Sequence, residues 1–106
     1  MDDLLALFKA LSDETRLRLI VLLAKREHCV CELTEILSLP QPRVSSHLAK
    51  LKALGVVRSR RESQFIHYSL ALEDEAVRRV VAVLRQQAHH YGVLREDDAR
   101  VPLCTR

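Results

Sequence analysis

The stretch LPQPRVSSHLAKLKALGVVRSRRESQFIHYSL, residues 39–70, contains the pattern that decides the fold. Its two prolines, Pro40 and Pro42, disfavour helix in the residues just before them and predict a tight turn. Four apolar residues then recur at helical spacing: Val44, Leu48, Leu51 and Leu54. Because Gly55 is a typical residue at a helix end, we predict a helix over residues 41–54.

From Val57 onward the pattern changes to the alternation of β-strands. Residues 61–63 are polar and fit a turn, so we expect a two-stranded hairpin. One face of the hairpin is assigned to Val57, Ser59, Phe65, His67 and Ser69. The opposite face is assigned to Ile66, Tyr68 and Leu70.

The remaining elements are expected to be helices. Helical spacing of apolar residues predicts helices over residues 4–11, 31–37 and 73–90. A further helix is predicted to follow the first one, with Ser12 as its N-cap. The predicted fold is mainly α with a small β-hairpin, in the order α-α-α-α-β-β-α. A short helix, a turn, a second helix and a hairpin make a winged helix-turn-helix. We place this domain over residues 1–92 and a polar tail over 93–106.

Size and composition narrow the class of protein. A chain of 106 residues forms one small core, for which burying surface in a dimer is favourable. No apolar run reaches the ~20 residues that span a bilayer, and the acidic start MDDLL is unlike a signal peptide. Three cysteines, an odd number, fit free thiols in a reducing compartment. We therefore expect a cytoplasmic protein with no membrane partner.

Charge is unevenly distributed along the chain. The net charge is +3, but residues 41–61 hold six basic residues and no acid, so the remainder is net −3. A single positive segment indicates a surface that binds a polyanion. The candidate DNA-binding residues on the helix are Gln41, Arg43, Ser45, Ser46, His47 and Lys50. Those on the hairpin are Arg58, Arg60 and Arg61.

These side chains suit two kinds of DNA contact. Gln, Arg and Ser reach base edges, while Lys50 and the hairpin arginines suit phosphates, which supply most of the salt-dependent affinity. The alternative for the helix is an ordinary solvated face, and for His47 a packed or capping side chain. The absence of acids from 41–61 favours DNA binding.

Four motifs in this order resemble the ArsR/SmtB family of bacterial metal-sensing repressors. They are LFKALSDETRLRLIVLL, CVCEL, LPQPRVSSHLAKLKALGVV and RRESQFIHYSL, and they cover roughly residues 4–84. The resemblance implies a homodimer built from the first and last helices. It also implies binding to an imperfect palindrome in double-stranded operator DNA and release when metal binds.

Cys29 and Cys31 stand where a helix is expected to begin. In a regular helix, residues i and i+2 lie ~200° apart, so one ion could take both sulfurs only if the chain is not yet helical there. A helix N-terminus also favours thiolate, and soft thiolates select thiophilic ions such as arsenite, cadmium, lead or mercury. Cys104 can complete a three-sulfur site, within its own chain or across the dimer, or it is a spare residue in a frayed terminus.

The motif is similar to the family's CVC(D/E)L box, whose cysteines bind arsenite or antimonite, often with a third cysteine three residues later. Here that position is Thr34. The resemblance therefore implies an arsenite- or antimonite-responsive repressor with Cys29 and Cys31 as ligands and no organic cofactor. Cys104 is the candidate for the third ligand. A cadmium-, lead- or zinc-sensing repressor and a thiol-redox sensor of the same fold are the alternatives.

Three further interpretations compete with this one. Cys29 and Cys31 can be small buried apolar residues, a common role of cysteine. His28, His89 and His90 can bind zinc, but the family's second sensing class needs a His near the start of the last helix, where this chain reads Glu73–Glu75. An enzyme is not expected, because the chain has neither a CxxC motif nor a glycine-rich loop.

Overall fold

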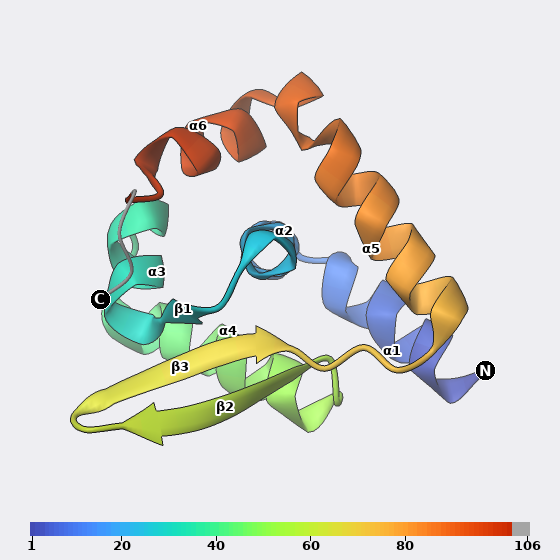
Figure 1. Cartoon of the computed structure of the whole chain (residues 1–106), viewed down its shortest axis with the longest axis horizontal. Coiled ribbons are helices and arrows are strands. Elements are labelled where there is room, and N and C mark those ends of the chain that lie inside the picture. Colours follow the sequence, from blue (N-terminus) through green and yellow to red (C-terminus); the bar gives the residue numbers. More distant parts are fainter. Residues whose placement is uncertain (103–106) are drawn as a thin grey trace.

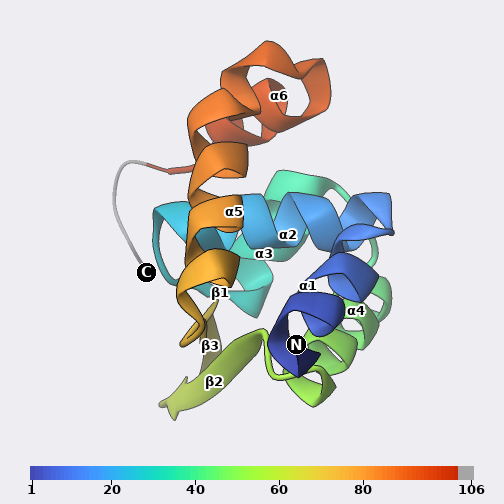
Figure 2. The same ribbon diagram turned by 90° about the vertical axis from the view of Figure 1, so that its right-hand side faces the viewer.

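The computed structural model describes residues 1–102. Its elements are α1 (Asp2–Leu11), α2 (Glu14–Lys25), β1 (His28–Cys29), α3 (Val30–Leu37), α4 (Gln41–Ala53), β2 (Val57–Glu62), β3 (Phe65–Leu70), α5 (Glu75–Gln87), the 3₁₀ turn η1 (Ala88–His90) and α6 (Gly92–Arg100). Figure 1 shows α2 in the middle of the molecule, with the other helices around it and the sheet along one side. Figure 2 shows the β2–β3 hairpin projecting from the helices as a wing.

Helix α4 follows its predicted pattern. Val44, Leu48 and Leu51 are fully buried, so the apolar stripe faces the core. The turn before it places Ser38 in the left-handed region, and Pro42 lies in the first turn of α4, where its missing N–H costs nothing. Gly55 has a φ of +78°, which explains a glycine where the helix ends. The prediction of a helix-turn-helix is confirmed.

Helix α2 supplies the central part of the core. Leu19 and Ile20 are fully buried, and Leu22 and Leu23 nearly so. The cap of this helix is Asp13, whose carboxylate accepts a hydrogen bond from the Arg16 backbone N–H at 3.0 Å. Ser12, which was expected to cap α2, instead ends α1 and bonds back to the Lys9 carbonyl. The predicted break between the two helices is confirmed, but the N-cap of α2 is one residue later than expected.

The sheet has three strands in the order β1-β3-β2. Val57 pairs with Leu70 and Ser59 with Tyr68, so these residues share a face, contrary to the assignment from sequence. The turn occupies only residues 63 and 64, with Ser63 at a φ of +59°. Because the turn lies at residues 63 and 64 rather than 61–63, Val57 pairs with Leu70 instead of His67. This shift by an odd number of residues puts every β3 side chain on the face opposite to the one expected.

Strand β1 was not foreseen. It contains two residues, with His28 paired to Tyr68 and Cys29 paired to His67. Two residues are too few to show an alternating pattern in a sequence. This strand joins the segment that carries the first thiol to the wing.

The expected polar tail begins with a helix. In α6, Leu94 and Asp97 are buried, and Asp97 accepts hydrogen bonds from Arg18 of α2 at 2.8 and 2.9 Å. Arg100 donates to the Ile36 carbonyl of α3 at 3.1 Å. Charge pairs rather than an apolar stripe attach α6, so helical periodicity did not reveal it. No helix among residues 1–102 is long and apolar enough to cross a membrane.

Candidate metal centre and nucleic-acid interface

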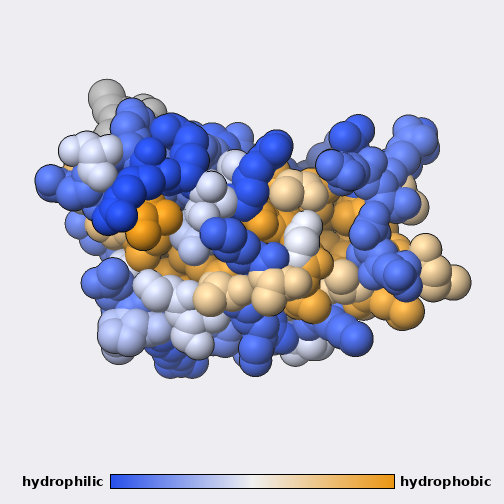
Figure 3. Space-filling view, turned by 90° about the horizontal axis from the view of Figure 1, so that it is seen from below, coloured by the Kyte–Doolittle hydropathy of each residue, from blue (hydrophilic) through white to orange (hydrophobic). Residues whose placement is uncertain are grey.

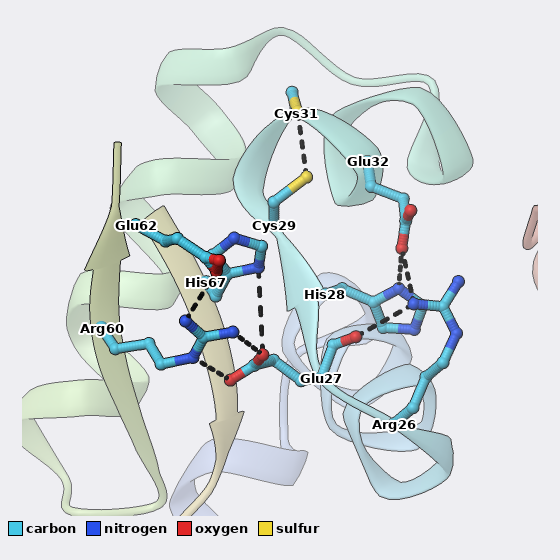
Figure 4. A network of polar contacts seen from close by, with 9 residues as sticks. All are labelled: Arg26, Glu27, His28, Cys29, Cys31, Glu32, Arg60, Glu62 and His67. Carbon is cyan, nitrogen blue, oxygen red and sulfur yellow. Dashed lines mark hydrogen bonds and ion pairs between the residues drawn. The ribbon is translucent and has the colours of Figure 1, made fainter. Parts of the chain in front are cut away.

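The two thiols meet at the start of α3. Cys29 has an extended backbone, with φ −80° and ψ 158°, and is the N-cap residue, whereas Cys31 already belongs to the helix. Their Sγ atoms lie 3.0 Å apart (Figure 4). The junction of β1 with α3 is therefore the non-helical geometry that brings sulfurs at i and i+2 to one side, as the sequence predicted.

The two sulfurs differ in their surroundings. Cys29 is 3% exposed and Cys31 is partly exposed. Burial, followed by the hydrogen bond with Cys31, raises the pKa of the Cys29 thiol above its ordinary value. Because burial disfavours the charged form, Cys29 is a protonated thiol at neutral pH. The expectation that the helix N-terminus makes it a thiolate is wrong for this residue.

This raised pKa predicts a pH dependence. Below the pKa the thiolate fraction grows about tenfold per pH unit, so alkylation of Cys29 by iodoacetamide should accelerate at that rate from about pH 7 to pH 9. Mass spectrometry with fragmentation assigns the alkylated residue, and the Cys29→Ser variant gives the Cys31 rate as control. A Cys29 rate that levels off near neutral pH would mean that its pKa is lowered instead.

A third ligand for an ion is not present among the described residues. No group of three His, Cys, Asp or Glu side chains within residues 1–102 could hold a metal ion. Thr34, at the position of the family's third cysteine, donates its hydroxyl to the Val30 carbonyl at 2.8 Å. Cys104 lies outside the described residues. The Pro102 carbonyl accepts a hydrogen bond from Arg26, three residues before Cys29, at 3.3 Å.

A buried polar cluster underlies the thiol segment. His28 is fully buried and its Nδ1 contacts the Glu32 carboxylate, which also pairs with Arg26 at 3.1 Å (Figure 4). Desolvation lowers the pKa of His28, so its ring is neutral near pH 7. The cluster fixes the first turn of α3 to the end of α2. From the sequence, His28 was considered only as a metal ligand. Its contact with Glu32 crosses the junction of β1 with α3, so helical spacing did not indicate it.

The side chains predicted to reach bases differ in exposure. Gln41, Arg43, Ser46 and Lys50 are exposed on α4, while Ser45 and His47 are partly buried. The His47 Nδ1 lies 3.8 Å from the Asp13 carboxylate at the start of α2. His47 therefore takes part in helix packing, the alternative considered for it from the sequence.

A groove of about 370 Å³ connects Cys31 to this surface. It is lined by Val30, Cys31, Gln41, Ser45, Gln64, Phe65, Ile66 and Tyr68. Figure 3 views the molecule from the side of the sheet and shows hydrophilic side chains flanking a band of apolar surface. Cys31 thus shares a groove with two residues of α4 and with the wing.

The three arginines of the wing are not equivalent. Arg58 and Arg61 are exposed. The Arg60 guanidinium donates to the Glu27 carboxylate at 2.6 and 3.0 Å and to Glu62 at 3.1 Å. The hydrogen bonds from Arg60 lower the pKa of Glu27, so this carboxylate is ionised at neutral pH. Arg60 is therefore held within the protein rather than freely presented.

Residues 13–59 match the model of the bacterial regulatory protein, arsR family. The arsenic resistance transcriptional regulator ArsR1 of Pseudomonas putida is 48% identical over 64 residues, which are 59% of this chain and 50% of that protein. A cadmium resistance regulatory protein, a CadC homolog of Staphylococcus aureus, is 39% identical over 80 residues, which are 74% of this chain and 64% of that protein. The chain thus spans about half to two thirds of these relatives' length.

Solved structures agree. HlyU from Vibrio cholerae superposes with a TM-score of 0.72 at 33% identity, over 79% of this chain and 89% of that one. This chain belongs to the ArsR family. A second similar solved structure is the homodimeric winged helix-turn-helix DNA-binding domain Mb0332 of Mycobacterium bovis. It superposes on this ArsR-family chain with a TM-score of 0.68 at 29% identity, over 86% of each chain. The family is one of DNA-binding transcriptional regulators, not of enzymes.

Proposed function

We propose that this chain is a transcriptional repressor that binds arsenite or antimonite at Cys29 and Cys31 and then leaves its operator DNA. The observation that carries the proposal is the 3.0 Å separation of the two sulfurs at the start of α3, next to the candidate recognition helix α4. Sulfur ligands favour thiophilic ions over magnesium or calcium. The name of the Pseudomonas putida relative, a regulator of arsenic resistance, supports the same ligand class.

Binding must open the site. The sulfurs are already adjacent, so gathering them does not require the helix to distort, as a straight-helix geometry would. However, Cys29 is 3% exposed, and an ion bonded to it at ~2.2–2.3 Å needs space that the closed site lacks. The junction of β1 and α3 must therefore shift. Because α3 packs on α4 and β1 pairs with the wing, this shift displaces both DNA-contacting elements.

Cys104 is the proposed third sulfur ligand. Pro102, the last described residue, accepts a hydrogen bond from the Arg26 side chain through its carbonyl. A sulfur ligand at this position can come from the same chain or from the second copy of a dimer. We therefore expect Cys104→Ser to weaken the response to arsenite without abolishing it.

The repressor is proposed to act as a homodimer on an imperfect palindrome. Leu5 and Phe8 on α1 and Val83 on α5 are 52%, 53% and 55% exposed, which is unusual for large apolar side chains on adjacent helices. A second copy covering both helices would bury them. The homodimeric Mb0332 domain supports this arrangement.

Replacing Phe8 with Glu should break this dimer. A carboxylate at a buried interface position costs several kcal/mol when unpaired, so association should weaken by at least about a hundredfold. Sedimentation velocity at micromolar concentration should show monomer for Phe8→Glu and dimer for the wild type. Glu35→Gln, on an exposed position of α3, is the control. A dimeric Phe8→Glu variant would exclude α1 from the interface.

The salt dependence of DNA binding should separate the wing arginines. Arg61 is exposed, so Arg61→Ala should reduce the salt slope by about one unit. Arg60→Ala should reduce it by less, because Glu27 and Glu62 partly neutralise that charge. Fluorescence anisotropy with duplex DNA between about 50 and 200 mM salt measures both slopes. A larger reduction of the salt slope by Arg60→Ala than by Arg61→Ala would contradict the partial neutralisation of Arg60 by Glu27 and Glu62.

Two other inducers remain candidates. The name of the CadC homolog, a cadmium resistance protein, supports cadmium within the cadmium, lead or zinc alternative. The close sulfurs support a redox response. A disulfide between i and i+2 closes a small strained ring, which makes the redox response less favourable. The test is a release titration of an operator duplex, selected by the protein from a random pool, under full reduction. Release by arsenite at lower concentration than by cadmium supports the proposal, and release only on oxidation refutes it.

A further inference from the structure

The segment that carries Cys29 is connected to the wing by two sets of contacts. The first is the sheet, in which Cys29, His67 and Arg60 stand opposite one another in three adjacent strands. The second is Glu27, two residues before Cys29, whose carboxylate accepts two hydrogen bonds from Arg60. Figure 4 shows these side chains side by side. A movement of Cys29 therefore acts on Arg60 through both the backbone and a side chain.

Arg60 can meet DNA while it is held by Glu27. A guanidinium has five N–H donors, and the hydrogen bonds to Glu27 and Glu62 use three of them. The Arg60 side chain is 52% exposed, which leaves donors for a phosphate. Its direction, however, is set by Glu27, because two parallel hydrogen bonds fix the plane of the guanidinium.

The two carboxylates that hold Arg60 belong to different parts of the molecule. Glu62 lies in β2, two residues along from Arg60, and moves with the wing. Glu27 lies outside the hairpin, between α2 and the strand of Cys29. Of these two carboxylates, only that of Glu27 can transmit a change at the thiols to the wing, although both neutralise the same charge.

We propose that Glu27 is a positioning residue that couples the thiol site to the wing: an ion bound at Cys29 displaces Glu27 and turns Arg60 away from the DNA phosphate. This inference rests on the proposed function of the thiols. It adds a route through the wing to the displacement of α4. Two routes account for release better than one, because the wing and α4 contact DNA independently.

The matched variants are Glu27→Gln and Glu62→Gln. Each removes one negative charge beside Arg60 and keeps the shape of the side chain. Both should therefore bind an operator duplex more tightly and with a steeper salt slope than the wild type. The quantity that distinguishes them is the coupling ratio, the dissociation constant for DNA with saturating arsenite divided by that without it.

We expect Glu27→Gln to lower the coupling ratio at least about threefold. Glu62→Gln should leave the ratio within about 1.5-fold of the wild type. Both changes are measurable, because allosteric coupling in proteins is typically about 5–150-fold. Arsenite binding without DNA, followed by the near-ultraviolet absorption of sulfur–arsenic bonds, should be unchanged in both variants. That readout separates loss of coupling from damage to the thiol site. The double variant Glu27→Gln, Arg60→Gln should have the same coupling ratio as Glu27→Gln alone, since both changes break the same contact between Glu27 and Arg60.

The outcomes separate the two proposals. A wild-type ratio near one refutes the proposed function and this inference with it. A large wild-type ratio that Glu27→Gln shares refutes the inference alone. Equal losses in Glu27→Gln and Glu62→Gln also refute it, because the effect would then come from the charge of Arg60 rather than from its link to Cys29.

Discussion

Cys29→Ser and Cys31→Ser should each abolish the release of operator DNA by arsenite while leaving DNA affinity in the absence of arsenite within about twofold of the wild type. A serine hydroxyl keeps the size of the thiol but is a poor ligand for a thiophilic ion. Allosteric factors of this kind are typically about 5–150-fold, so the loss is large enough to measure by fluorescence anisotropy under reducing conditions.

Thr34→Ser provides the control for these two variants. It changes a side chain of α3 by one methyl group, keeps the hydroxyl that bonds to Val30 and leaves both thiols in place. Its release curve should match that of the wild type. Full release from a Cys29→Ser, Cys31→Ser double variant would show that the ion is sensed elsewhere, and His89 with His90 would then be the next candidates.

Asp97→Ala should be among the most destabilising single changes in the chain. Asp97 is 1% exposed and pairs with Arg18, so removing it leaves a largely buried guanidinium without its partner. Breaking a buried ion pair in this way costs about 3–5 kcal/mol of unfolding free energy. Urea unfolding at one fixed protein concentration measures the loss, which matters because a dimer gains stability with concentration.

The matched change is Asp98→Ala, one residue further along α6. Asp98 pairs with Arg85, but both side chains are more than 20% exposed. Because water still reaches this partly buried pair, breaking it should cost less stability than breaking the pair of Asp97 with Arg18. Equal, small losses for Asp97→Ala and Asp98→Ala would mean that α6 does not contribute to the folded domain.

The elements that sequence predicted and those it missed differ in what stabilises them. The stripe of Val44, Leu48 and Leu51 is a periodic apolar signal, and α4 formed where it indicated. Helix α6 depends on Asp97 finding Arg18, a contact between residues far apart in the chain that leaves no local pattern. The register of the wing depended on a turn of two residues, which polar composition did not specify.

The candidate site divides in the same way. The proximity of the two sulfurs followed from the geometry of a helix start, and the structure has it. The burial of Cys29 did not follow, because it results from the pairing of β1 with β3. Likewise, His28 and Glu32 are polar residues that a sequence places at the surface, yet they are buried because they bind each other. Arg60 was predicted to contact a DNA phosphate, and its hydrogen bonds to Glu27 could not be foreseen from the sequence.

The central claim is that one thiophilic ion is bound by the thiols of Cys29 and Cys31. X-ray absorption at the arsenic edge of the arsenite-loaded, fully reduced protein tests it most directly, because it counts the atoms bonded to arsenic and identifies them as sulfur or oxygen. We predict at least two sulfur ligands at ~2.2–2.3 Å, similar to zinc–thiolate lengths, and a third when Cys104 takes part. The Cys104→Ser variant should then retain two. An arsenic atom surrounded only by oxygen or nitrogen would contradict the account.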